Sequence, residues 1–207
     1  MLKKILITGC DGYIGWPFFL KTALKNKEYK IIGVDNFGRR KWVKEVKEKS
    51  FTKIYSLNER LKELKKISKR KNFRFINLDL TNYKKTSSLI KKFKPDIIFH
   101  LAAQPSAPYA NSNPQRATYT NYNNNQSTLN MLWALKKNNL LKTIFVETTT
   151  TGVYGTPDFN INEGFNILNK NPIPFHNLGG SWYHISKSND CNYLWLANRL
   201  WGLTVID

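Results

Sequence analysis

Short apolar runs alternate with longer amphipathic stretches along this chain of 207 residues. Six runs are rich in β-branched or aromatic residues and apolar at almost every position, which predicts strands buried on both faces. They are residues 3–8, 29–35, 73–79, 96–103, 142–149 and 203–207. Five amphipathic stretches between them predict helices, at residues 14–25, 57–68, 84–92, 115–137 and 182–201. This alternation predicts an α/β fold with a doubly wound parallel sheet.

Two stretches interrupt the alternation, and we expect both to be loops. Residues 104–115 contain three prolines, and residues 156–180 are rich in asparagine, proline and glycine. Long loops that follow strands in an open α/β sheet commonly contact ligands. Both segments are therefore candidate substrate-binding loops.

Three glycines, Gly9, Gly12 and Gly15, lie between the first predicted strand and the first predicted helix. Glycine permits a tight turn and lets backbone N–H groups approach a pyrophosphate, and the following helix directs its positive end at that anion. A glycine turn alone is weak evidence, because it can be merely structural. Its position between strand and helix predicts a dinucleotide site in a Rossmann fold.

Asp35 strengthens this prediction, because it ends the second predicted strand 20 residues after Gly15. A carboxylate there can accept hydrogen bonds from both ribose hydroxyls. It favours NAD over NADP, since a 2′-phosphate would meet its negative charge. Arg39 and Arg40 follow closely and could bind that phosphate instead, so NADP stays open.

Tyr183 and Lys187 lie four residues apart at the start of the last predicted helix, and therefore on one helix face. A neighbouring ammonium and a bound nicotinamide would both lower the pKa of the tyrosine and make it a usable acid–base group. The lysine could also hold the nicotinamide ribose. The alternative is a core tyrosine beside a surface lysine. A hydroxyl from residues 148–151, all threonine, could share the proton with Tyr183.

The composition excludes some classes of function. The net charge is +19, but the lysines of residues 58–69 alternate with apolar residues at helical spacing, so we favour a solvated helix face over a nucleic-acid partner. Two cysteines, Cys10 and Cys191, do not suggest a disulfide framework, and no metal-ligand spacing occurs. The apolar segment before Cys10 is too short for a secretory signal, and no run could span a bilayer. We therefore expect a cytoplasmic protein without a metal.

Together these residues resemble the extended short-chain dehydrogenase/reductase family, whose members act on nucleotide sugars. The resemblance covers essentially the whole chain. Its motifs are the T-G-x-x-G-Y-I-G turn (Thr8–Gly15), Asp35, Asp79–Leu80, His100–Ala103, Asn124, Val153–Gly155 and the Tyr183/Lys187 pair. Within the family the chain is most similar to the UDP-sulfoquinovose synthase group, on residues 35–40, 104–110, 119–130, 153–164 and 181–187.

This resemblance implies the residues of the site. The cofactor would be NAD, held by Gly9, Gly12, Tyr13, Ile14, Gly15, Asp35, Asn36, Arg39, Asp79, Leu80, Leu101, Ala102, Ala103, Asn124, Tyr183 and Lys187. The catalytic set would be Thr150, Tyr183 and Lys187, with His184 near the reacting carbon. The substrate would be a nucleotide sugar of the UDP-glucose type, contacted by Gln104, Ser106, Tyr109 and Thr150, with sulfite as a second substrate. A homodimer is left open.

The chain also departs from the synthase pattern. Pro105 replaces an arginine and Val153 a carboxylate, so that residues 153–155 have the pattern of sugar epimerases. The Asp-Glu pair of 4,6-dehydratases is absent, since Thr151 and Gly152 occupy those positions. We expect transient oxidation at sugar C4 by a UDP-sulfoquinovose synthase-like enzyme. The alternatives are UDP-glucose 4-epimerase, other 4-keto chemistry, and a dinucleotide-binding protein with a basic face for nucleic acid.

The same resemblance implies the domain organisation. Residues 1–207 would form an NAD-binding Rossmann domain, truncated after the sixth strand and lacking most of a smaller C-terminal substrate domain.

Overall fold

The computed structural model of the protein describes residues 3–25, 28–68, 72–155, 166–168, 171–173 and 179–207. Within these residues, six strands form one parallel sheet and two further strands form an antiparallel pair. The parallel strands are β1 (Lys3–Thr8), β2 (Tyr29–Asp35), β3 (Phe73–Asn77), β4 (Ile97–His100), β5 (Ile144–Glu147) and β8 (Thr204–Ile206). The antiparallel pair is β6 (Asn166–Leu168) and β7 (Asn171–Ile173).

Helices connect the parallel strands. They are α1 (Gly15–Lys25), α2 (Gly38–Glu45), α3 (Leu57–Ser68), α4 (Tyr83–Phe93), α5 (Ala107–Asn111), α6 (Pro114–Lys137), the short 3-10 helix η1 (Thr151–Tyr154), and α7 (Trp182–Trp201). Asn113 and Ser181 cap the two longest helices, because their side-chain oxygens accept the backbone N–H groups of Arg116 and His184.

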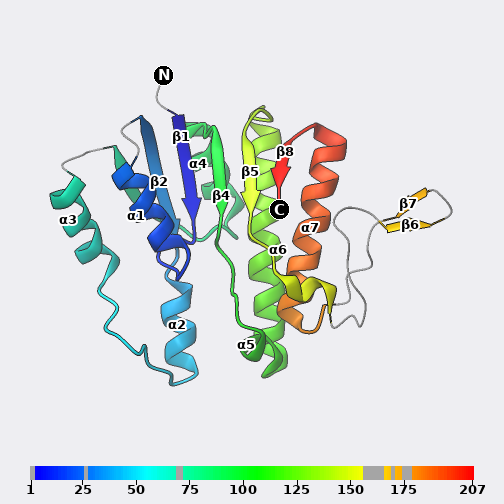
Figure 1. Cartoon of the computed structure of the whole chain (residues 1–207), viewed down its shortest axis with the longest axis horizontal. Helices are drawn as coiled ribbons and strands as arrows, with labels where there is room; N and C mark the ends of the chain where they lie inside the picture. Colours follow the sequence, from blue (N-terminus) through cyan, green and yellow to red (C-terminus); the bar gives the residue numbers. More distant parts are fainter. Residues whose placement is uncertain (1–2, 26–27, 69–71, 156–165, 169–170, 174–178) are drawn as a thin grey trace.

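The strand order of the sheet is β3-β2-β1-β4-β5-β8. The chain starts in the middle at β1, proceeds outward to β3, and then crosses to β4 on the other side of β1. The connections after β1 and β4 therefore lead in opposite directions, and a crevice opens between them at the carboxyl ends of the strands. All six strands point the same way, so the loops that follow them gather at one edge of the sheet (Figure 1).

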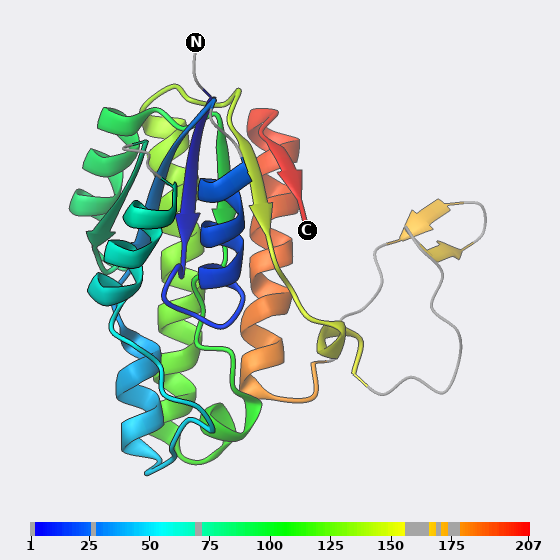
Figure 2. The ribbon, with the colours of Figure 1, turned by 60° about the vertical axis from the view of Figure 1, so that its left-hand side comes forward.

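Helices cover both faces of the sheet, and alternate strand residues supply two cores. Leu6 and Ile32 belong to the core formed with α4, α6 and α7. Ile5, Ile7 and Ile31 belong to the core formed with α1 and α3. Figure 2 shows α1 and α3 in front of the sheet and α6 and α7 behind it. Two cores on one sheet confirm the doubly wound α/β fold.

Amide side chains connect α6 with α7 along part of their length. Asn124 donates from Nδ2 to Ser186 Oγ at 3.0 Å, and Asn125 donates from Nδ2 to the Ser186 carbonyl oxygen at 2.7 Å and to Asp190 Oδ1 at 3.0 Å. Asn189 donates from Nδ2 to Asn125 Oδ1 at 3.4 Å. These bonds fix the register of the two helices where α7 carries Tyr183.

The structure confirms the six predicted strands and the five predicted helices, with shifted ends. The expectation that every strand is buried on both faces is wrong for the edge strands, since Arg74 in β3 and Thr204 in β8 are exposed. Helices α2 and α5 were not predicted. The predicted loop at residues 156–180 contains β6 and β7, while residues 156–165, 169–170 and 174–178 lie outside the described part of the chain.

Candidate functional site

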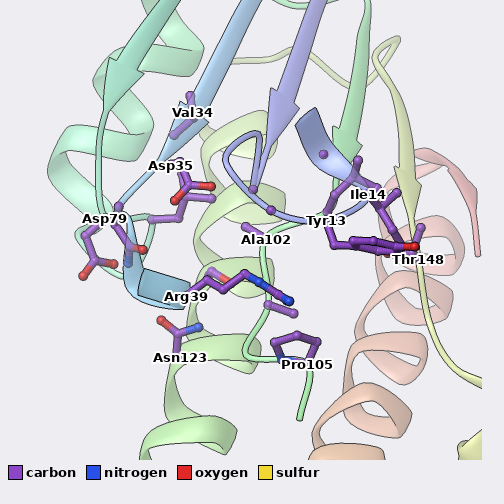
Figure 3. A pocket seen from close by; sticks show the side chains of 18 of the residues that line it. Tyr13, Ile14, Val34, Asp35, Arg39, Asp79, Ala102, Pro105, Asn123 and Thr148 are labelled. Carbon is purple, nitrogen blue, oxygen red and sulfur yellow. The ribbon is translucent and has the colours of Figure 1, made fainter. Parts of the chain in front are cut away.

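A cavity of about 260 Å³ lies at the carboxyl ends of β1, β2, β3, β4 and β5. Figure 3 shows Asp35 and Asp79 at one end and Tyr13, Ile14 and Thr148 at the other, with the Arg39 side chain reaching across the space between them. The loops after five strands thus converge on one crevice, as the topology requires. The cavity extends from the end of β2 to the first turn of α7, where Tyr183 also lines its wall.

The glycine turn is closely packed, and this explains why glycine stands at its ends. Gly9 has a φ of +68°, and a Cβ added there would lie 2.5 Å from the Leu101 carbonyl oxygen. A Cβ on Gly15 would collide with the Gly9 carbonyl oxygen. At Gly12 a Cβ would approach the Gly9 oxygen at 3.1 Å. Gly12 itself lines the cavity, so its bare backbone lets a ligand come close.

Asp35 holds the glycine turn and the start of α2 together. Its Oδ2 accepts the N–H of Asp11 at 2.8 Å, and its Oδ1 accepts the N–H of Phe37 at 2.7 Å. Burial raises the pKa of Asp35, and the two backbone donors offset part of that rise. Each carboxylate oxygen can accept more than one hydrogen bond, so the side chain remains able to receive ribose hydroxyls.

A cluster of charges lies directly behind Asp35. The buried carboxylate of Asp11 accepts two hydrogen bonds from Arg40, at 2.7 and 3.0 Å, and one from Arg60. The Arg60 guanidinium also lies 4.4 Å from the centre of the Trp16 ring. Sequence reasoning had offered Arg40 as a phosphate ligand, and the structure instead pairs it with Asp11.

Tyr183 is the predicted catalytic residue that the structure places in the cavity wall. Burial raises its pKa above the ordinary value of 10, and the charge of Lys187 offsets only part of this rise. The net direction is therefore opposite to the one expected from Lys187 alone. Of the four candidate threonines, Thr148 and Thr149 line the cavity, whereas the hydroxyl of Thr150 accepts the Gly152 N–H at 3.2 Å and caps η1.

The ammonium group of Lys187 is buried behind the cavity wall. It donates to Glu147 Oε1 and to Asp190 Oδ2, the latter at 2.9 Å. Burial raises the pKa of Glu147 to about 8, and the two carboxyl groups raise the pKa of Lys187. Glu147 Oε2 and the neighbouring His100 Nε2 are buried without a hydrogen-bond partner among the described residues. Lys187 is therefore held in a buried polar cluster and is not part of the cavity wall.

The predicted substrate residues do not line this cavity. Gln104 is buried, and its backbone N–H donates to Asn124 Oδ1 at 2.7 Å. Ser106 caps α5 by accepting the Tyr109 N–H, and the Tyr109 hydroxyl donates to Glu45 Oε2 at 2.7 Å. Burial, followed by this bond, raises the pKa of Tyr109 to about 12. These residues support the loop, and their predicted contact with a substrate stays a prediction.

His184 packs against η1. A Cβ on Gly152 would collide with its imidazole, and the ring centre lies 5.3 Å from that of Tyr183. His184 Nδ1 is buried without a hydrogen-bond partner among the described residues. The proposed role of His184 near a reacting carbon stays a prediction.

Most of the predicted cofactor residues lie together. Those that line the cavity are Gly9, Gly12, Tyr13, Ile14, Gly15, Asp35, Asn36, Arg39, Asp79, Leu80, Leu101, Ala102, Ala103 and Tyr183. Asn124 and Lys187 lie behind it. The wall also contains residues that sequence reasoning missed, namely Val34, Trp42, Leu78, Pro105, Asn123 and Ser127. For Asn123 and Ser127 a signal existed, because they stand one residue and three residues from Asn124.

Other features of the described residues bear on the expected class of protein. None of the helices there is long and apolar enough to cross a membrane. No group of three or more potential ligand side chains within the described ranges could hold a metal ion. Cys10 and Cys191 are both free thiols.

Comparisons with known proteins identify relatives of the chain. The sequence model of the family described as GDP-mannose 4,6 dehydratase matches residues 6–174 of this chain. UDP-sulfoquinovose synthase of Sulfolobus acidocaldarius is 37% identical over 210 residues, which are 99% of this chain and 52% of that protein. The chloroplastic UDP-sulfoquinovose synthase of Spinacia oleracea is 31% identical over 99% of this chain and 42% of its own length. The chain thus spans about half the length of these relatives.

Solved structures show the same fold. UDP-glucose 4-epimerase of Bifidobacterium longum, in complex with NAD+ and UDP, has a TM-score of 0.71 at 20% identity over 98% of this chain and 51% of that one. The enzyme WbmH of Bordetella bronchiseptica, in complex with NAD+, has a TM-score of 0.59 at 25% identity over 95% of this chain and 53% of that one.

Proposed function

Because the chain belongs to the GDP-mannose 4,6-dehydratase family of extended short-chain dehydrogenases/reductases, we propose that its cavity binds NAD and serves a nucleotide-sugar enzyme. One observation supports this most strongly. The glycine turn, Asp35 and Tyr183 line a single cavity, although Tyr183 stands 168 positions after Gly15 in the sequence. A merely structural glycine turn would not require a tyrosine at the far end of the same crevice.

The residues present fit a dinucleotide. The bare backbone at Gly12 and the start of α1 suit a pyrophosphate, and Asp35 keeps acceptor capacity for ribose hydroxyls. Asp79 and Leu80 line the cavity beside Asp35, where they would contact an adenine. NAD supplies reversible hydride transfer when bound.

Tyr183 would hold and move the proton of the sugar hydroxyl at its phenolic oxygen. Its raised pKa keeps the phenol protonated at neutral pH, which suits it to donate when the hydroxyl is reformed. Acting as base requires a lower pKa, which additional positive charge in the cavity would supply. Lys187 lies one helical turn away and contributes positive charge to this environment.

For the substrate we propose UDP-glucose, with sulfite as the second substrate and UDP-sulfoquinovose as the product. In this conversion a sulfonate would replace the C6 hydroxyl group and water would be released, while bound NAD would supply the reversible oxidation at C4 that acidifies the proton on C5. The conversion therefore consumes no net oxidant. The similarity to UDP-sulfoquinovose synthases over 99% of this chain supports this choice.

UDP-glucose 4-epimerase is the second candidate. Two features of the chain favour it, since Pro105 and Val153 stand where the synthase pattern has an arginine and a carboxylate. Pro105 lines the cavity and offers no positive charge to an anionic substrate.

The test is to incubate the full-length protein with NAD and UDP-glucose, with and without sulfite, and to separate the products by mass. A sulfonated nucleotide sugar that forms with sulfite supports the synthase. UDP-galactose formed equally in both incubations, without a sulfonated mass, would refute the synthase and support the epimerase. NAD bound without any conversion would support a binding protein instead.

A further inference from the structure

We propose that Asp11 is a specificity-determining residue that makes the cavity select NAD+ over NADP+ by neutralising Arg40 and Arg60. This inference rests on the proposed binding of a dinucleotide, and it goes beyond the usual role of Asp35. It assigns a purpose to a charge cluster that lies behind the cavity and touches no part of the proposed catalytic machinery.

The cluster is connected to the cavity through one residue. The backbone N–H of Asp11 donates to Asp35 Oδ2 at 2.8 Å, and the carboxylate of the same Asp11 holds both arginines. Asp35 itself lines the cavity (Figure 3). Asp11, Arg40 and Arg60 do not themselves line the cavity, so in the wild type the cluster acts on a ribose phosphate through the Asp35 carboxylate that it contacts.

Arginine is the side chain best suited to bind such a phosphate, because its planar guanidinium forms two parallel hydrogen bonds. In this structure two nitrogen atoms of the Arg40 guanidinium are already engaged. Arg40 directs Nε and Nη2 at the two Asp11 oxygens, and its Nη2 also donates to the Tyr55 carbonyl oxygen at 3.1 Å. Arg60 is bound to Asp11 and stacked on Trp16.

The charges of the four groups also balance. Asp11 and Asp35 carry two negative charges and Arg40 and Arg60 two positive charges, so the wild-type cluster is neutral. The side chain of Asp11 is only 4% exposed, whereas that of Arg40 is 38% exposed. Of the two arginines in the cluster, Arg40 is therefore the one that can turn toward a ligand once Asp11 no longer holds it. Arg39 lines the cavity in the wild type and in every variant, so its contribution to the ratio of the two affinities stays the same.

The variant Asp11→Asn retains the shape of the side chain and removes its charge. The cluster then carries one net positive charge, and Arg40 either binds the 2′-phosphate or pairs with Asp35 and cancels its repulsion. Both rearrangements favour NADP+. We expect the ratio of the dissociation constants for NADP+ and NAD+ to fall about tenfold or more.

Binding should be measured by calorimetry with NAD+ and NADP+ on the full-length protein. The double variant Asp11→Asn/Arg40→Gln restores neutrality and should return the ratio close to that of the wild type. Asp96→Asn is the matched control, because Asp96 accepts the Lys4 N–H at the opposite end of the sheet. Its ratio should equal that of the wild type.

A purely structural role of Asp11 predicts a different result. Loss of a clip between the glycine turn and α3 would weaken both dinucleotides equally, and an unchanged ratio in Asp11→Asn would overturn the proposal while leaving NAD binding intact. If Asp11→Asn does not fold, Arg40→Gln tests the proposal in its place, because this variant retains Asp11. That variant should strengthen the preference for NAD+, and an unchanged ratio there would also overturn it. A wild type that binds neither dinucleotide would overturn both proposals.

Discussion

Replacing Glu147 with glutamine should remove a pH dependence of stability that the buried cluster around Lys187 imposes. Burial raises the pKa of Glu147 from its ordinary value of 4.5 to about 8. At neutral pH Glu147 is then largely protonated, and it accepts a hydrogen bond from the Lys187 ammonium group. Glutamine has the same shape as the protonated acid and should fit the site.

The sign and size of the effect follow from proton linkage. Between about pH 4.5 and pH 8 the folded protein keeps a proton on Glu147 that the unfolded chain has released, so the free energy of unfolding falls as pH rises. The whole interval corresponds to about 5 kcal/mol at 1.36 kcal/mol per pH unit. Relaxation around buried charges reduces this value, and we expect a change of about 2 kcal/mol or more.

The assay is urea unfolding of the wild type and Glu147→Gln, followed by circular dichroism at intervals from about pH 5.5 to about pH 8.5. The difference between their free energies of unfolding should move in favour of the variant as pH rises. Glu63→Gln, which removes an exposed carboxylate of α3, should show a constant difference. If the difference for Glu147→Gln is also constant across the series, Glu147 is not protonated in the folded protein and the reasoning fails.

Two further predictions concern the cavity. Tyr183→Phe removes the phenolic oxygen from the wall and should lower the rate of sugar conversion by at least about 100-fold while leaving NAD affinity nearly unchanged, and near-normal turnover in a mass assay would contradict its acid–base role. Gly15→Ala places a methyl group against the Gly9 carbonyl oxygen and should cost about 3 kcal/mol or more of stability in urea unfolding. Gly202→Ala, at a φ of +66° with open space around it, should cost about 1 kcal/mol, so similar losses in the two variants would contradict the collision.

The main elements could be predicted because their apolar patterns are long or strongly buried. Helix α2 was missed because its sequence, Gly38–Glu45, has no apolar stripe and because it begins after Phe37 in a left-handed conformation, with φ of 60°. Helix α5 is five residues long, which is too short to show a period, and its prolines indicated a loop. Local pattern therefore gave the sheet and the long helices but not the short ones beside the cavity.

The position of Lys187 shows what spacing alone cannot reveal. Four-residue spacing placed it correctly on the face of α7 that carries Tyr183. The direction of its ammonium group depends on Glu147, which is 40 residues earlier and reaches it from β5 across the core. The pairing of Arg40 with Asp11 is similar, because Arg40 stands 29 positions after Asp11. Single residues were predictable where they follow strand ends, and their charge partners were not.

The hydrogen bonds that asparagine side chains form between α6 and α7 limit which residues this helix interface can accept. An apolar helix interface accepts many residues of similar volume, and the helices can then slide to relieve a local clash. Here a slide of α7 by one residue, a rise of about 1.5 Å, would separate Asn125 from both of its acceptors at once. The position of Tyr183 along the axis of α7 is thus fixed by residues that do not line the cavity. Replacing these asparagines with leucines would consequently let α7 shift along α6. Any gain in folding stability would then be accompanied by a less precise position of the Tyr183 hydroxyl group.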